Sequence, residues 1–191
     1  DIDEHAAASA KLSIYDSIGC MIAGSRHSCF GNLRAYLEAY GGAELCSVLA
    51  ADGLRTDPEH AAGMNAMAAH ILDYDDMCAA LYGHATSGVL SAAMAIAEME
   101  HCSGKAFLHA FMVGADVAAL MGIGVMHGGY PHALDSSATL TIVGTAVAAG
   151  LLMNLDQERL ENAIAIAISE GAGFRANYGT LAKDLTAGRT P

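Results

Sequence analysis

The fold class of this chain depends on residues 136–155, which read SSATLTIVGTAVAAGLLMNL. The segment has no charged side chain, and its length is about the 20 residues that a membrane-spanning helix needs. Hydroxyl side chains and Asn154 interrupt it, however, and no Lys or Arg flanks it closely. We therefore expect a buried central helix, with a small membrane protein built on this segment as the alternative.

The segments around it also have the spacing or the capping residues of helices. Asp57-Pro58 is a typical helix start, and Ser103 and Asp156 are N-cap residues before apolar runs. Helices are predicted over residues 6–24, 31–40, 58–70, 86–100, 104–125, 136–155 and 157–171, with Thr86 or Ser87 as one cap.

A short β-hairpin is predicted near residues 45–54, LCSVLAADGL, with Asp52-Gly53 at its turn. One hairpin does not make a sheet, so we expect a single all-α domain over residues 1–191 with the hairpin attached to it.

Composition limits the function. The chain has 191 residues, of which 53% are hydrophobic, and its net charge of −12 argues against a nucleic-acid surface. Five scattered cysteines without a CxxC pattern predict free thiols in a reducing compartment, and no signal peptide opens the sequence. We expect a cytoplasmic protein.

The first candidate site is residues 72–88, LDYDDMCAALYGHATSG. Asp73, Asp75 and Asp76 precede His84, and a carboxylate beside a histidine is common equipment for acid–base catalysis. A solvated loop with helix caps is the alternative.

Two further groups could take part. His127, His132 and Asp135 lie in a glycine-rich loop, but their spacing matches no metal-ligand pattern, and no metal is expected. Lys183 and Arg189 lie in the polar segment 174–191, where they suit a carboxylate ligand or are ordinary surface charges.

Five stretches, taken in order, resemble the MmgE/PrpD family, which includes 2-methylcitrate dehydratase, cis-aconitate decarboxylase and iminodisuccinate epimerase. They are LSIYDSIGCMIAGSRH, DPEHAAGMNAMAAHILDYDD, GHATSGVLSAAMAIAE, SSATLTIVGTAVAAGLLMNLD and LAKDLTAGRTP. The resemblance implies a helical domain of a cofactor-independent, usually dimeric lyase or isomerase that moves a proton next to a substrate carboxylate. It places Asp73, His84 and Lys183 at positions of the family's active site.

The sequence also departs from the family pattern. Met77 replaces a common Thr, Asp135 stands where a His is common, and Thr186 replaces the His of Lys-Pro-Leu-His. We predict Asp73, His84, Asp135 and Lys183 as catalytic, and Met77, His132, Thr186 and Arg189 as substrate-binding. Asp75 is expected to be structural or solvated.

The resemblance further implies a lid domain that would follow residue 191. We expect a lid-bearing partner chain, a homodimer, or both, acting on a carboxylate-bearing small molecule. A non-catalytic helical scaffold or regulatory subunit that kept the fold is the alternative.

Overall fold

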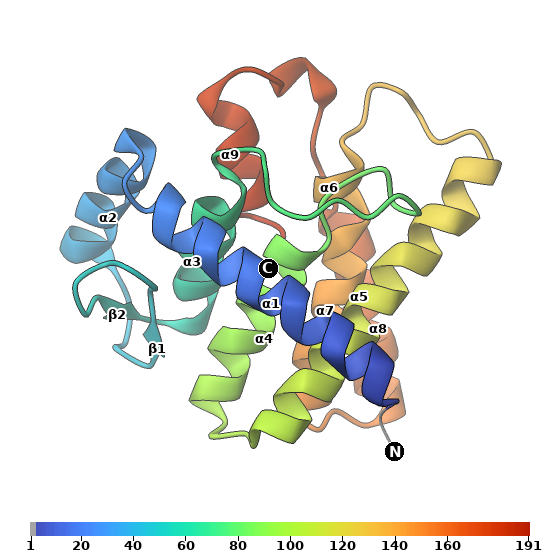
Figure 1. Ribbon diagram of the computed structural model, residues 1–191, viewed down its shortest axis with the longest axis horizontal. Coiled ribbons are helices and arrows are strands. Elements are labelled where there is room, and N and C mark those ends of the chain that lie inside the picture. The colour runs from blue at the N-terminus through green and yellow to red at the C-terminus, as the bar shows by residue number, and fades with distance from the viewer. Residues whose placement is uncertain (1–2) are drawn as a thin grey trace.

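The computed structural model describes residues 3–191, most of which form helices (Figure 1). The chain elements, in order, are α1 (Glu4–Gly24), α2 (Ser28–Tyr40), β1 (Cys46–Ser47), β2 (Arg55–Thr56), α3 (Pro58–His70), α4 (Thr86–Met99), α5 (Gly104–His127), α6 (Ser136–Thr139), α7 (Thr141–Leu152), α8 (Gln157–Glu170), a 3₁₀ turn η1 (Arg175–Asn177) and α9 (Leu181–Ala187). The predicted all-α class with a short hairpin is confirmed.

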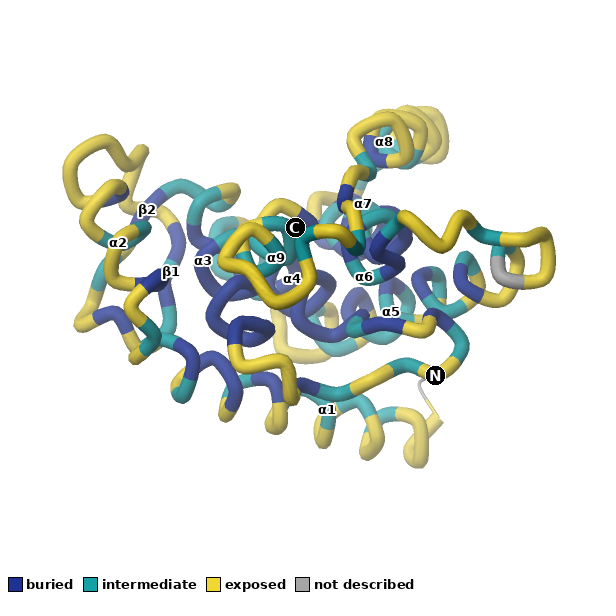
Figure 2. Tube along the Cα trace, turned by 90° about the horizontal axis from the view of Figure 1, so that it is seen from above, coloured by how far each residue is buried: buried dark blue, intermediate teal, exposed yellow. Residues whose placement is uncertain are grey.

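The helices form layers around a buried centre. Figure 2 shows α1 along one face and α8 standing on the opposite face, with the buried residues of α3 and α4 between them. Helix α1 packs against α3, and α8 packs against α7. The apolar residues of α3 and α4 are buried on more than one side, because neighbouring helices cover them from several directions.

Small residues allow these helices to approach closely. A Cβ placed on Gly144 of α7 would lie 2.2 Å from the carbonyl oxygen of Gly114 in α5. A Cβ on Gly24 would lie 1.9 Å from the carbonyl oxygen of Ala68, where α1 crosses α3. Glycine is thus required at both crossings, and the abundance of Ala and Gly reflects this packing.

The central segment is buried, as predicted, but it is two helices rather than one. Leu140 separates α6 from α7, and the Thr139 hydroxyl donates to the Asp135 carbonyl, a contact that bends helices. In the described chain, one helix is long and apolar enough to cross a membrane, residues 104–125 within α5. A single helix of this kind is weak evidence for a membrane span, because core helices pass the same test.

The hairpin is fastened to the helical body. Its strands pair Cys46 with Thr56 and Ser47 with Arg55, so the second strand starts just beyond the predicted range. Asn65 of α3 accepts from the Leu49 amide at 2.8 Å and donates to the Ser47 carbonyl at 3.1 Å. The hairpin is therefore joined to the middle of α3 rather than forming a separate unit.

Three details of the helix predictions were wrong. Helix α2 begins at Ser28, because the His27 ring accepts from the Cys29 amide and caps it. Neither Thr86 nor Ser87 caps α4, since both lie inside the helix and the Thr86 hydroxyl donates to Asp76 instead. The polar segment 174–191 contains α9, which was not predicted.

Candidate active site

The candidate site is built on the loop between α3 and α4, residues 71–85, which passes α9 and α6 at one end of the molecule (Figure 1). Asp73 turns this loop with a left-handed φ of 55°, a conformation that Asp tolerates better than most residues. Cys78 and Gly83 form an isolated antiparallel bridge farther along, with an amide–carbonyl distance of 2.9 Å. The loop is thus shaped by its own backbone.

The far end of the loop is held against the start of α6. The His84 amide donates to Ser137 Oγ at 3.0 Å, and Ser136 Oγ donates to the Tyr82 carbonyl at 2.8 Å. A Cβ on Gly83 would lie 2.6 Å from Ser137 Oγ, so this approach requires glycine. These contacts fix the backbone that carries His84.

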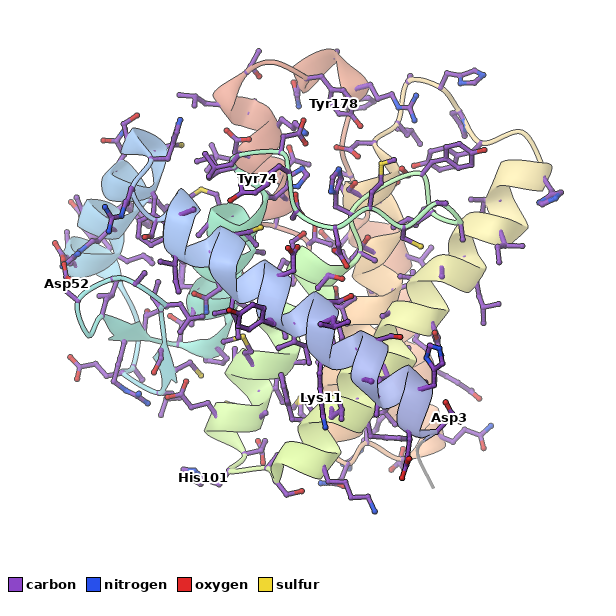
Figure 3. All side chains as sticks on the ribbon, in the orientation of Figure 1. Asp3, Lys11, Asp52, Tyr74, His101 and Tyr178 are labelled. Carbon is purple, nitrogen blue, oxygen red and sulfur yellow. The ribbon has the colours of Figure 1, made fainter. Side chains whose placement is uncertain are left out.

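The segment that leads into α9 is anchored to the same region. The Asp135 amide donates to the Gly173 carbonyl at 3.1 Å, and the Arg175 amide donates to the Ala133 carbonyl at 2.9 Å. This pairing places α9 beside the loop. Tyr74 of the loop and Tyr178 before α9 mark this end of the molecule in Figure 3.

Lys183 and Asp73 form the contact that joins α9 to the loop. The Lys183 ammonium donates to Asp73 Oδ1, across 110 residues of sequence. This hydrogen bond lowers the pKa of the Asp73 carboxyl. Lys183 also lies over the Tyr178 ring, 5.2 Å from its centroid. Lys183 is only 12% exposed and Asp73 61%, so the carboxylate is the open side of the pair.

Two histidines share a buried carboxylate behind this pair. His70 Nδ1 lies 3.0 Å from Asp75 Oδ1, and His84 Nδ1 lies 3.2 Å from the same oxygen. Burial alone would raise the pKa of Asp75, but the contacts with both imidazoles hold it well below its ordinary value. In turn, the hydrogen bond to Asp75 raises the pKa of His84.

Donor atoms of His70, Asp75 and His84 lie within 4.8 Å of one another, which is close enough to bind a metal ion. The nitrogen–oxygen distances of 3.0 and 3.2 Å are those of hydrogen bonds, however, and the Asp75 side chain has no exposed surface. Hydrogen bonding accounts for all three side chains.

Asp76 serves the framework of the loop. Its Oδ2 accepts from the Thr86 hydroxyl at 2.7 Å, and burial raises the pKa of its carboxyl. It therefore ties the loop to the first turn of α4.

Of the predicted catalytic residues, Asp73, His84 and Lys183 come together. Asp135 lies at the same end but is buried, and its Oδ1 accepts from the Ser137 amide as the N-cap of α6. Tyr178 links it to the others: burial, and then the Asp135 and Asp73 carboxylates, raise the pKa of the Tyr178 hydroxyl.

The predicted substrate-binding residues do not gather around Asp73. Met77 is 67% exposed on the loop, and His132 is exposed between α5 and α6. Thr186 and Arg189 instead line a largely apolar cavity of about 800 Å³ between α3, α4, α7, α8 and α9. That cavity is distinct from the Asp73–Lys183 pair, neither of which lines it.

Two residues near the site, His70 and Tyr178, were not predicted from the sequence. His70 ends the helix α3, and Tyr178 lies in the polar segment 174–191. Asp75 is structural, which is one of the two roles expected for it, because the His70 and His84 rings cover it. The signal available was the spacing of His70 and Asp75, which lets a helix end fold back on the loop.

Comparison with known proteins found a family model and curated relatives that match most of the chain. A family model described as the MmgE/PrpD N-terminal domain matches residues 1–190. Proteins named cis-aconitate decarboxylase from Mus musculus and Homo sapiens are each 28% identical to the chain over 184 residues. The alignments cover 94% of the chain and 38% of each relative, so the chain spans less than half the length of these curated relatives.

Proposed function

The chain belongs to the MmgE/PrpD family, and from that membership we propose that it acts on a carboxylate-bearing small molecule as a lyase or isomerase. The reaction class is proton transfer next to a carboxylate, which leads to dehydration, decarboxylation or epimerisation. The family includes enzymes such as the cis-aconitate decarboxylases that the chain resembles, which supports a lyase-type activity.

One observation carries this proposal: Asp73, His84 and Lys183 converge from two separate parts of the chain. His84 Nε2 lies 3.9 Å from Asp73 Oδ1, the oxygen that Lys183 contacts. A cation, an imidazole and a carboxylate within this distance can bind an anion and move a proton beside it.

Each group has a role in the proposed reaction. Lys183 pairs with a ligand carboxylate and stabilises the enolate-like charge that forms when a neighbouring C–H loses its proton. His84 accepts that proton at Nε2, and its side chain is 17% exposed, enough to reach a ligand. Its raised pKa suits a group that both takes and returns protons near neutral pH.

We further propose that additional polypeptide, in the same chain or in a partner, closes over the site as a lid. The side chain of Asp73 is 61% exposed, whereas proton transfer from carbon benefits from the exclusion of water. A lid would shield this carboxylate and strengthen every charge interaction in the site.

The test uses the protein together with any chain that co-purifies with it. NMR in D₂O would follow hydrogen exchange and product formation on cis-aconitate, citrate and related di- and tricarboxylates. We expect exchange in the wild type and a loss of about 100-fold or more in His84→Ala and Lys183→Ala. Lys11→Ala is the control, because this exposed lysine lies on α1 away from the site (Figure 3).

Absence of both exchange and binding for every carboxylate tested, with unchanged stability in the two variants, would refute the proposal. The helical scaffold or regulatory role would then be the better explanation.

A further inference from the structure

We infer that Asp75 and His70 are positioning residues that hold the His84 imidazole in one tautomer, with Nε2 presented to the ligand. The inference rests on the proposed function, because it concerns the histidine that exchanges a proton there. Neither residue reaches the ligand: the His70 side chain is 2% exposed and that of Asp75 is fully buried.

The tautomer follows from the hydrogen-bond partners. An ionised carboxylate only accepts, so an imidazole nitrogen that faces it must carry the proton. Asp75 Oδ1 lies 3.0 Å from His70 Nδ1 and 3.2 Å from His84 Nδ1, and the Asp75 carbonyl lies 3.2 Å from His84 Nδ1. Both rings therefore carry hydrogen on Nδ1, and Nε2 is the free nitrogen of each neutral ring.

The two rings also fix each other. Their centroids lie 4.7 Å apart at an interplanar angle of 62°, an edge-to-face arrangement. Both Nε2 atoms lie 3.9 Å from Asp73 Oδ1. Two carboxylates thus bracket two imidazoles, and only the more exposed ring, His84, can meet a ligand.

The charges around this unit come from three elements. The loop supplies Asp73 and Asp75, α3 supplies His70, and α9 supplies Lys183 and Asp184. Lys183 offsets the Asp73 carboxylate that it contacts, and a single proton on the imidazole pair offsets Asp75. His70 can occupy one side of Asp75 while His84 gains and loses that proton.

NMR of ¹⁵N-histidine-labelled protein tests the inference without an activity assay, because the ring nitrogen shifts report the tautomer and the titration. We expect wild-type His84 as the Nδ1–H tautomer, with a pKa above the ordinary value for histidine. In Asp75→Asn we expect the midpoint to fall, because the charged acceptor is gone, and some Nε2–H form to appear, because the Asp75 carbonyl is then the remaining acceptor that faces Nδ1.

A matched pair of His70 variants provides a second measurement. Asn at position 70 places an amide nitrogen close to where Nδ1 was and should preserve the His84 tautomer. Gln places its amide near the former Nε2, so Asp75 loses the donor that fixes its orientation toward His84, and the His84 tautomer should become mixed. This pair keeps the inference testable even if Asp75→Asn does not fold.

The results separate the inference from the proposed function. His84 in the Nε2–H tautomer in the wild type, or unchanged tautomer and titration in Asp75→Asn and His70→Gln, would overturn the inference. If the tautomer responds as expected, the inference holds even where no carboxylate exchanges hydrogen, and then only the proposed function fails. If exchange occurs, we expect Asp75→Asn to lower kcat at least 10-fold with little change in KM.

Discussion

Replacing Gly83 by Ala would test whether close contact between the loop and α6 sets the position of His84. The new Cβ would lie 2.6 Å from Ser137 Oγ and 3.0 Å from both Ser136 Oγ and the Ser137 amide nitrogen. Real Cβ contacts are seldom this short, so the loop must move by several tenths of an ångström. The backbone nitrogen cannot rotate away as a hydroxyl can.

The movement weakens two hydrogen bonds, His84 amide to Ser137 Oγ and Ser136 Oγ to the Tyr82 carbonyl. Each is worth about 0.5–1.5 kcal/mol, and the loss of chain entropy in the unfolded state returns about 0.4–1 kcal/mol. We expect Gly83→Ala to lower the free energy of unfolding by about 1–2 kcal/mol and to weaken carboxylate binding with it.

Urea unfolding gives the free energy, and titration with cis-aconitate gives the binding. Gly19→Ala is the matched control, because a Cβ there meets no described atom within 4 Å beyond its chain neighbours and the backbone of its own helix. This helix position should gain stability, by up to about 1 kcal/mol. The double variant Gly83→Ala, Ser137→Ala should lose less stability than the two single variants lose together, because Ser137→Ala removes the closest clash. Wild-type stability and binding in Gly83→Ala would refute the argument.

Two further changes test the electrostatics. Asp57 is the N-cap of α3, and hydrogen bonds from the His60 ring and amide outweigh burial and lower its pKa from 3.8 to about 2. The ionised Asp57 therefore contributes about 2 kcal/mol of stability, which should be present above pH 3.8 and lost toward pH 2. Urea unfolding at pH 7 and pH 3 should therefore show a smaller acid-induced loss of stability in Asp57→Asn than in the wild type. In Lys183→Met the pKa of Asp73, measured by ¹³C NMR of its carboxyl carbon, should rise toward its ordinary value. The control Lys11→Met should leave that pKa unchanged. An unchanged pKa in Lys183→Met would contradict the assigned contact.

The sequence predicted most of the fold because its local signals agree with the packing. Asp57-Pro58 started α3 at the predicted residue, and the uncharged segment 136–155 was buried as expected. The errors occur where a tertiary contact competes with a local one. Thr86 has the chemistry of an N-cap, yet its hydroxyl donates to Asp76, and α9 forms where a polar composition indicated a tail.

The site was predictable only in part, because its geometry depends on contacts far apart in the chain. The family resemblance indicated Asp73, His84 and Lys183, but periodicity alone gave no reason to pair residues 73 and 183. His70 illustrates the limit: it closes the core helix α3, and only the fold shows that its ring turns toward Asp75. The site therefore holds two imidazoles, although Asp135 stands where a histidine is common in the family.

In the proposed reaction, binding of the ligand would itself change the Lys183–Asp73 contact. In the free protein, Lys183 is committed to Asp73 and lowers the pKa of that carboxyl. A ligand carboxylate that binds Lys183 must compete with Asp73 for the same ammonium. Once Lys183 is shared, Asp73 becomes a stronger base and a better partner for a protonated His84, 3.9 Å away. The arriving charge would therefore stabilise the proton that His84 takes from the ligand, which couples binding of the carboxylate to the proton transfer beside it.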